Sequence, residues 1–210
     1  LPGEKPGMEN FYHGAGNVWN RRYGGDVQGL IWALPYLKKL GITAIYLNPM
    51  FEADSLHKYD ASDYRHIDEH FGFKGDIEQL HGETDDPATW QLTKTDRLFL
   101  QFVAKAHAMG FHVVLDGVFN HVGRDFWAFK DVLKNGEKSK YADWFDIRDW
   151  HKPIKYIAWD TGSTPTDHGA LPIFKKDPVL GLVHGPREHV LAVARRWLAP
   201  ARERTEIDVK

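Results

Sequence analysis

Two short apolar segments rich in β-branched residues constrain the fold of this chain more than any other feature. Ile42–Leu47 and His112–Leu115 each follow a stretch whose apolar residues recur at helical spacing, and those stretches end at Gly41 and Gly110. A short apolar run behind an amphipathic helix is typical of a parallel strand buried on both faces. Helices that alternate with such strands predict an α/β fold with a parallel sheet.

The boundaries of three helices can be predicted from the residues. Asp26 is a suitable N-cap for the first helix, and Pro35 inside it is expected to kink or shorten it. Thr95 is the expected cap of the second helix. The third helix is expected over about residues 186–198, with a proline in its first turn. Ile207–Val209 is the candidate start of a further strand.

Two long polar stretches, residues 51–92 and 122–182, follow the predicted strands and not the helices. Long ordered connections are usually functional. In a (β/α)8 barrel, the segments after the strands form the face where sites are built. The sequence therefore predicts that a site lies at the strand ends.

Composition excludes several classes of function. The chain has 210 residues, a net charge of −2 and no cysteine. A near-neutral charge gives no electrostatic footprint for nucleic acid, and the lack of cysteine excludes disulfides and zinc thiolates. No apolar run reaches the roughly 18 residues of a membrane helix. Aromatic residues make up 13% of the chain, which taken alone favours core packing over sugar stacking. Compartment and oligomeric state stay open.

Three strings carry the chemistry, and they occur in a consistent order. They are Tyr23-Gly-Gly-Asp26 with the helix and strand after it, His57-Lys-Tyr59-Asp-Ala-Ser-Asp-Tyr64, and Asp116-Gly-Val-Phe-Asn-His121. Together they resemble the α-amylase family of glycoside hydrolases, and the first is most similar to its cyclomaltodextrinase, neopullulanase and maltogenic amylase branch. The resemblance extends from about Tyr23 to about Pro200.

The resemblance implies a partial (β/α)8 TIM barrel with a small inserted domain after the third barrel strand. Residues 1–121 are then the N-terminal part of the catalytic barrel without its first strand, and residues 122–182 are the insertion. Residues 183–210 are the third barrel helix and the start of a fourth strand. Leu171–Lys175 resembles a string of the inserted domain, which places Trp159 and Phe174 either beside the cleft or in the core.

The same resemblance assigns roles in binding an α-glucan. Asp116 is expected to brace the cleavage subsite, His121 to hydrogen-bond the sugar there, and Tyr59 to stack on it. His57 is expected to hydrogen-bond a hydroxyl group of the sugar. From the residues alone, two simpler interpretations stay open: Asp116 as a polar strand end that bonds local backbone, and His57 as an exposed loop histidine.

A calcium ion is the one cofactor that the resemblance suggests. The Gly24 carbonyl and the Asp26 carboxylate would be two of its ligands. Calcium takes about six to eight oxygen ligands, so this pair is an incomplete site. The alternative is that Asp26 only caps its helix.

The bond-breaking residues are not identified in this chain. The family uses a retaining mechanism with two carboxylates about 5–5.5 Å apart. Asp208 is left without a catalytic role, because Glu206 stands where the family has arginine and would raise the pKa of a neighbouring carboxylate. No candidate for the general acid is found. We expect the isolated chain to be poorly stable and inactive.

The function that the resemblance implies is hydrolysis of α-1,4-glucosidic bonds in cyclodextrins, pullulan, starch or maltooligosaccharides. One alternative is a relative that cuts α-1,6 bonds or transfers glucan. Another is a non-catalytic carbohydrate-binding relative. An unrelated α/β metal-binding protein is disfavoured, because the 12 histidines are scattered and form no His-x-x-x-His pair on one face of a predicted helix.

Overall fold

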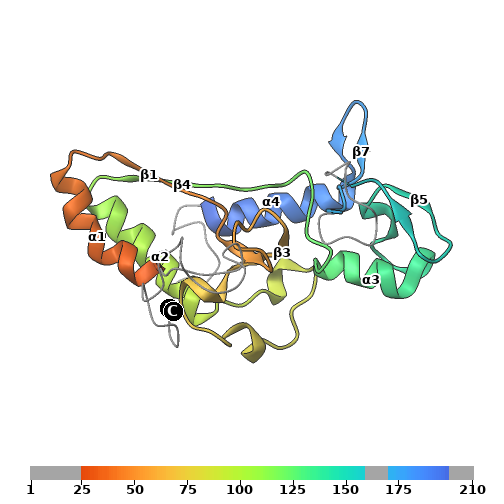
Figure 1. Cartoon of the computed structure of the whole chain (residues 1–210), viewed down its shortest axis with the longest axis horizontal. Coiled ribbons are helices and arrows are strands. Elements are labelled where there is room, and N and C mark those ends of the chain that lie inside the picture. Colours follow the sequence, from red (N-terminus) through yellow and green to blue (C-terminus); the bar gives the residue numbers. More distant parts are fainter. Residues whose placement is uncertain (1–24, 159–169, 199–210) are drawn as a thin grey trace, which may run out of the picture. The chain divides into compact units, whose positions relative to one another are not determined.

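The computed structural model describes residues 25–158 and 170–198 (Figure 1). These residues form two compact units. The first unit combines residues 25–58 with 66–116, and the second combines 59–65 with the described residues after 116. Several residues named above lie outside the described part of the chain: Tyr23, Gly24, Trp159, Glu206, and Asp208 with the candidate strand Ile207–Val209.

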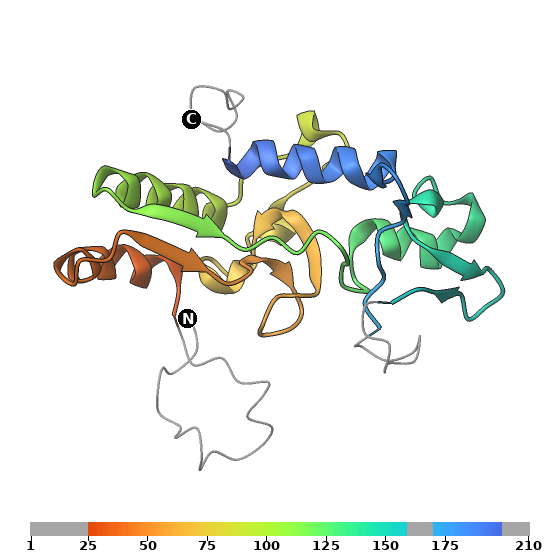
Figure 2. The same cartoon turned by 90° about the horizontal axis from the view of Figure 1, so that it is seen from above.

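The first unit contains the predicted alternation of helices and strands. Its elements are α1 (Val27–Lys39), β1 (Ala44–Leu47), β2 (Phe51–Ala53), α2 (Lys94–Ala108) and β4 (His112–Leu115). β1 and β4 pair in parallel, in a register that runs from Ala44 opposite His112 to Leu47 opposite Leu115. The two strands lie side by side in both views, with α1 and α2 next to each other (Figures 1 and 2). The predicted parallel pair is confirmed.

Both helices of the first unit end in the same way, at a glycine with φ of +81°, Gly41 after α1 and Gly110 after α2. In each case the glycine and the residue after it donate backbone hydrogen bonds back to the last turn. These bonds are Gly41 to Lys38 (3.0 Å), Ile42 to Leu37 (3.2 Å), Gly110 to His107 (2.9 Å) and Phe111 to Ala106 (3.0 Å). This is the Schellman arrangement, and it turns each helix directly into its strand.

The starts of the helices confirm one prediction and correct another. The Asp26 carboxylate accepts a hydrogen bond from the Gly29 N–H at 2.7 Å, as expected of an N-cap. The cap of α2 is Thr93, so the assignment to Thr95 is wrong. Thr93 and Asp96 form a reciprocal capping box, which satisfies two backbone donors at once.

Pro35 does not shorten α1, which continues to Lys39. Pro35 has no N–H, so the helix lacks one backbone hydrogen bond at this residue. Helical hydrogen bonding continues after Pro35, where the Leu40 N–H donates to the Tyr36 carbonyl at 3.1 Å.

The two parallel strands are not buried on both faces, contrary to the prediction. Ile45 and Leu47 are buried, whereas Tyr46 is 60% exposed and Val114 is 46% exposed. α1 and α2 lie on one side of the strand pair (Figure 1). Within the described part of the chain, the opposite face has no such cover, so it stays open to solvent.

The second unit is built around aromatic side chains. Its elements are α3 (Trp127–Asn135), β5 (Ile147–Asp149), β6 (Lys155–Tyr156), β7 (Lys176–Asp177), β8 (Gly181–Leu182) and α4 (His184–Leu198). β5 pairs with β6 and β7 with β8, both antiparallel. α4 confirms the predicted third helix, whereas α3 was not predicted. Phe174 is fully buried and stacks on Phe145, so it belongs to the core.

β3 (Ala61–Ile67) forms a two-stranded sheet with β2, and its residues are divided between the two units. Among the described residues, no helix is long and apolar enough to cross a membrane. The domain boundaries predicted after residues 121 and 182 stay predictions.

Candidate functional site

Asp116 lies directly after β4, where its backbone and its side chain are both tied to β1. Its N–H donates to the Leu47 carbonyl at 3.1 Å, which extends the parallel ladder by one residue. The Tyr46 hydroxyl donates to the Asp116 carboxylate at 2.6 Å. Side chains alternate along strands, so Tyr46, Val114 and Asp116 share the open face of the pair. Tyr46 was not singled out from the sequence, because the bond depends on the strand register.

His57 is exposed, and its Nδ1 lies 3.1 Å from the Ser55 hydroxyl. Tyr59, two residues later, is 37% exposed. Neither observation assigns a partner outside the chain. The roles of His57 and Tyr59 toward a sugar stay predictions.

In the second unit, His121 is 4% exposed and bonds protein atoms through both ring nitrogens. Its Nε2 lies 2.9 Å from the Tyr59 carbonyl, and its Nδ1 lies 2.8 Å from the Asn120 amide nitrogen. A carbonyl only accepts, so Nε2 carries the proton, and Nδ1 accepts from the amide. Burial lowers the pKa of His121, which agrees with a neutral ring. His121 thereby holds the backbone of Tyr59.

The segment that carries His121 is fixed from both sides. Residues 120–122 form antiparallel bridge contacts with 172–174, including bonds from Phe174 N–H to the Asn120 carbonyl (3.1 Å) and from Val122 N–H to the Pro172 carbonyl (3.0 Å). The buried hydroxyl of Tyr64 contacts the carbonyls of Val118 and His121. This support explains how a strand-end loop can hold a histidine ring in place.

Gly123 makes a close backbone approach to the loop that carries Tyr59. Its N–H donates to the Ala61 carbonyl at 2.8 Å. A Cβ at this position would lie 2.3 Å from the Asp60 carbonyl oxygen, which no side chain tolerates. The loop therefore rests directly on the segment after His121.

In the first unit, Lys58 is buried beside two carboxylates. Its ammonium group donates to the Asp68 carboxylate at 2.5 Å and to the Ala53 carbonyl at 2.9 Å. Glu52 lies close by, where its carboxylate accepts a bond from the Glu69 N–H at 2.6 Å. Burial, with a smaller contribution from the charge of Asp68, raises the pKa of Glu52 to about 8. We call Glu52, Lys58, Asp68 and Glu69 the Lys58 cluster.

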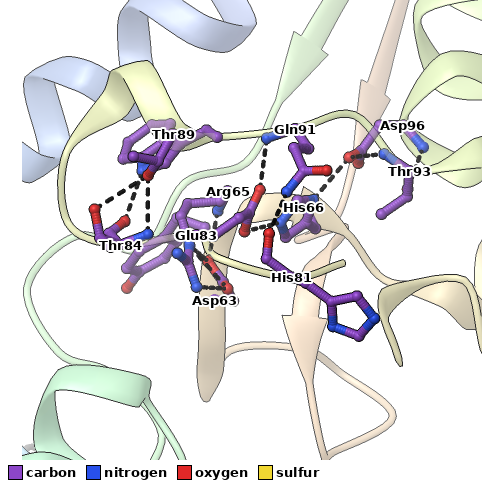
Figure 3. A network of polar contacts seen from close by, with 12 residues as sticks. Asp63, Arg65, His66, His81, Glu83, Thr84, Thr89, Gln91, Thr93 and Asp96 are labelled. Carbon is purple, nitrogen blue, oxygen red and sulfur yellow. Dashed lines mark hydrogen bonds and ion pairs between the residues drawn. The ribbon is translucent and has the colours of Figure 1, made fainter. Parts of the chain in front are cut away.

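A second polar network organises the segment before α2 (Figure 3). The ring of His66 lies between two carboxylates, with 2.8 Å from Nδ1 to Asp96 and 2.8 Å from Nε2 to Glu83. The second oxygen of Glu83 accepts from the Gln91 N–H at 2.6 Å. His66 thus links the end of β3 to the capping box of α2 and to residues 81–91.

The calcium prediction rests on a single described side chain. One oxygen of the Asp26 carboxylate caps α1, and Gly24 lies outside the described residues. One carboxylate is far short of the about six to eight oxygens that calcium takes. Calcium stays a prediction.

The helix-and-strand order, with polar strings at the strand ends, defines a chain of the α/β class that is consistent with part of a barrel enzyme. The sequence-family model of the alpha amylase catalytic domain matches residues 8–87 and 94–173 of this chain. The chain therefore belongs to the alpha-amylase catalytic domain family.

Similar proteins lie in the branch that the strings indicated. A cyclomaltodextrinase of Thermoanaerobacter pseudethanolicus is 44% identical over 153 residues, which are 73% of this chain and 21% of that protein. Neopullulanase 2 of Thermoactinomyces vulgaris is 35% identical over 208 residues, or 98% of this chain and 30% of that protein. The chain thus spans about a fifth to a third of these relatives.

Similarity to solved structures supports the same family assignment. A cyclic alpha-maltosyl-(1→6)-maltose hydrolase from Arthrobacter globiformis has a TM-score of 0.60 at 33% identity, over 85% of this chain and 36% of that one. The debranching enzyme of Nostoc punctiforme has a TM-score of 0.63 at 32% identity, over 85% of this chain and 31% of that one.

The Asn120→Asp substitution is expected to raise the pKa of His121. A carboxylate at position 120 accepts a bond from a protonated Nδ1, whereas the amide donates to a neutral one. Titration of the ring by NMR measures this. Asn135→Asp, at an exposed position on α3, is the control and should leave the pKa of His121 unchanged. An unchanged or lower value in Asn120→Asp would show that the side chain of residue 120 does not contact Nδ1 of the ring.

Glu52 is expected to make the protein less stable as the pH rises. Its folded-state pKa of about 8 lies above its ordinary value of 4.5, so its contribution is complete below about pH 4.5 and is lost as the pH rises through about 8. Urea unfolding between these limits measures the decline. Glu52→Gln cannot ionise and should show a flatter profile, whereas the exposed Glu137→Gln should match the wild type. Equal slopes in all three proteins would contradict the assignment.

Proposed function

We propose that this chain is part of a retaining glycoside hydrolase that acts on α-1,4-glucosidic bonds of cyclodextrins, pullulan, starch or maltooligosaccharides. Its contribution is a part of the sugar-binding surface. The observation that carries the proposal is the supported Tyr59–His121 pair, which lies in two strings of a chain belonging to the alpha-amylase family. The names of the relatives, cyclomaltodextrinase and neopullulanase, support the substrate class.

Each predicted residue has a role in this proposal. Tyr59 stacks its ring on the sugar, and an exposed ring on an anchored backbone suits that role. Asp116 is a carboxylate braced by Tyr46 at a strand end, where it can bond a hydroxyl group without moving. His57 supplies a further polar contact from an exposed position.

The role that we propose for His121 is narrower than the sugar contact predicted from the sequence. Both of its ring nitrogens bond protein atoms, so a direct bond to a sugar requires one of these bonds to open. We therefore propose that the main role of His121 is to hold the Tyr59 carbonyl through its hydrogen bond. Its bond to the sugar stays a prediction.

The chain by itself is proposed to be inactive, because its sequence does not identify the nucleophile or the general acid of the family's retaining mechanism. Incubation of the purified 210-residue chain with starch or β-cyclodextrin should release no reducing sugar above a buffer blank. Sustained release of reducing sugar would overturn this part of the proposal.

A second candidate is a relative that cleaves α-1,6 bonds. The debranching enzyme and the cyclic alpha-maltosyl-(1→6)-maltose hydrolase among the structural neighbours favour it. Both candidates use the same binding surface, so the linkages that survive in the products of pullulan digestion separate them. Products that keep every α-1,6 bond support the first candidate.

Removal of the Tyr59 ring tests the proposed surface in the full-length enzyme. Tyr59→Ala should lower kcat/KM for β-cyclodextrin by on the order of 10- to 100-fold, because the sugar loses the contact that positions it. Tyr36→Ala removes another exposed tyrosine, on α1, and should leave kcat/KM unchanged. An effect of equal size in both variants, or none in either, would refute the role of Tyr59.

A further inference from the structure

Lys58 combines two features that are each uncommon for a lysine. It is 3% exposed, and it is the one described residue other than glycine with a positive φ, at +63°. Left-handed backbone is unfavourable for residues with a Cβ. Such a residue persists when its surroundings over-determine its conformation, which is most common near functional sites.

The surroundings of Lys58 meet that condition. Its ammonium group bonds Asp68 and the Ala53 carbonyl, and its backbone N–H donates to the Ser55 hydroxyl at 3.0 Å. Asp68 is fully buried and is itself fixed by the N–H groups of Ala53 (3.2 Å) and His70 (2.9 Å). A buried charge stays only where it is paired and hydrogen-bonded, so the side chain has one arrangement.

Tyr59 follows Lys58 directly in the chain. The side chain of Lys58 is directed into the first unit, and the peptide bond after it starts the exposed residue that the proposed function requires. A glycine at position 58 could adopt the same φ at no cost, but it could not be anchored. The lysine therefore supplies an anchor through its side chain, which the left-handed backbone conformation alone does not require.

We propose that Lys58, through its buried bonds to Asp68 and the Ala53 carbonyl, is a positioning residue for the sugar-stacking ring of Tyr59. The proposal rests on the proposed function of Tyr59. Lys58 itself touches no sugar. It fixes the backbone from which the ring projects, as the bond from His121 to the Tyr59 carbonyl does on the other side of the residue.

A double-mutant cycle in the full-length enzyme tests this. Lys58→Gly keeps the left-handed backbone accessible and removes only the anchor. Its effect on kcat and KM for β-cyclodextrin is measured with Tyr59 present and in the Tyr59→Ala background. With Tyr59 present, we expect kcat/KM to fall about tenfold, divided between kcat and KM as in Tyr59→Ala. In the Tyr59→Ala background, the further change should stay within about twofold.

Three outcomes overturn the proposal. If Lys58→Gly lowers kcat/KM by the same factor in both backgrounds, Lys58 acts independently of Tyr59. If it has no effect with Tyr59 present, no anchor is needed. If Tyr59→Ala alone has no effect, the proposed sugar-stacking role fails and the positioning role falls with it. The first two outcomes leave the proposed function intact.

The buried carboxylate of Asp68 could unfold the Lys58→Gly protein when it loses its partner. In that case the cycle is run with Lys58→Gly and Asp68→Asn combined, which removes both charges. The matched control is Lys155→Gly with Asp149→Asn, which removes an exposed Lys–Asp ion pair of 3.0 Å between β6 and β5. It should change kcat/KM by less than about twofold in either background.

Discussion

The in-register parallel pairing of β1 with β4 decides where the polar residues of the candidate site begin. Parallel strands end at the same edge, so the residues that follow both of them start together. The pairing needs both strands to run the same way, and the Schellman turns at Gly41 and Gly110 supply this by leading each helix into its strand in the same manner. Asp116 then meets Tyr46 as a consequence of register.

Beyond the strand ends, the chain loses the regular ladder, and buried side chains take over its function. Asp96 accepts from the Ile67 N–H at 2.7 Å while it also caps α2 and contacts His66. The Asp68 carboxylate likewise accepts hydrogen bonds from the backbone N–H groups of Ala53 and His70. A buried N–H without a partner is costly, so carboxylates that accept several bonds are an efficient way to fix irregular chain. Fixed irregular chain is what a binding surface requires.

The sequence predicted those features that depend on local chemistry. Helical spacing, the glycines after the helices and the cap at Asp26 follow from a few neighbouring residues, and they were found. The local sequence does not separate Thr93 from Thr95 as the cap of α2, because both stand at the start of the same apolar stripe. Only the reciprocal bond with Asp96 separates them, and Thr95 is used elsewhere, accepting from the Phe73 N–H at 2.8 Å.

Features that depend on long-range packing were missed or wrong. α3 lies in a stretch without clear period and is held by aromatic contacts such as Phe129 with Phe145, which are distant in the sequence. The role of Lys58 was hidden, although the residue stands inside a string that was singled out, because its partner Asp68 comes ten residues later on another segment. The family resemblance predicts which residues form the site, but it does not show which neighbours hold them in place.

The open face of β1 and β4 explains why the burial prediction failed while the strand prediction succeeded. An apolar run indicates a strand that has cover on both sides in its final context, and the described residues cover one side only. In a complete barrel, inward-facing side chains of several strands fill the interior in layers. Tyr46 suits such a place, because its hydroxyl already bonds Asp116 and its ring could be covered without a lost polar contact. The same face can therefore carry an apolar interior and, one residue beyond the strand, the Asp116 carboxylate that Tyr46 braces.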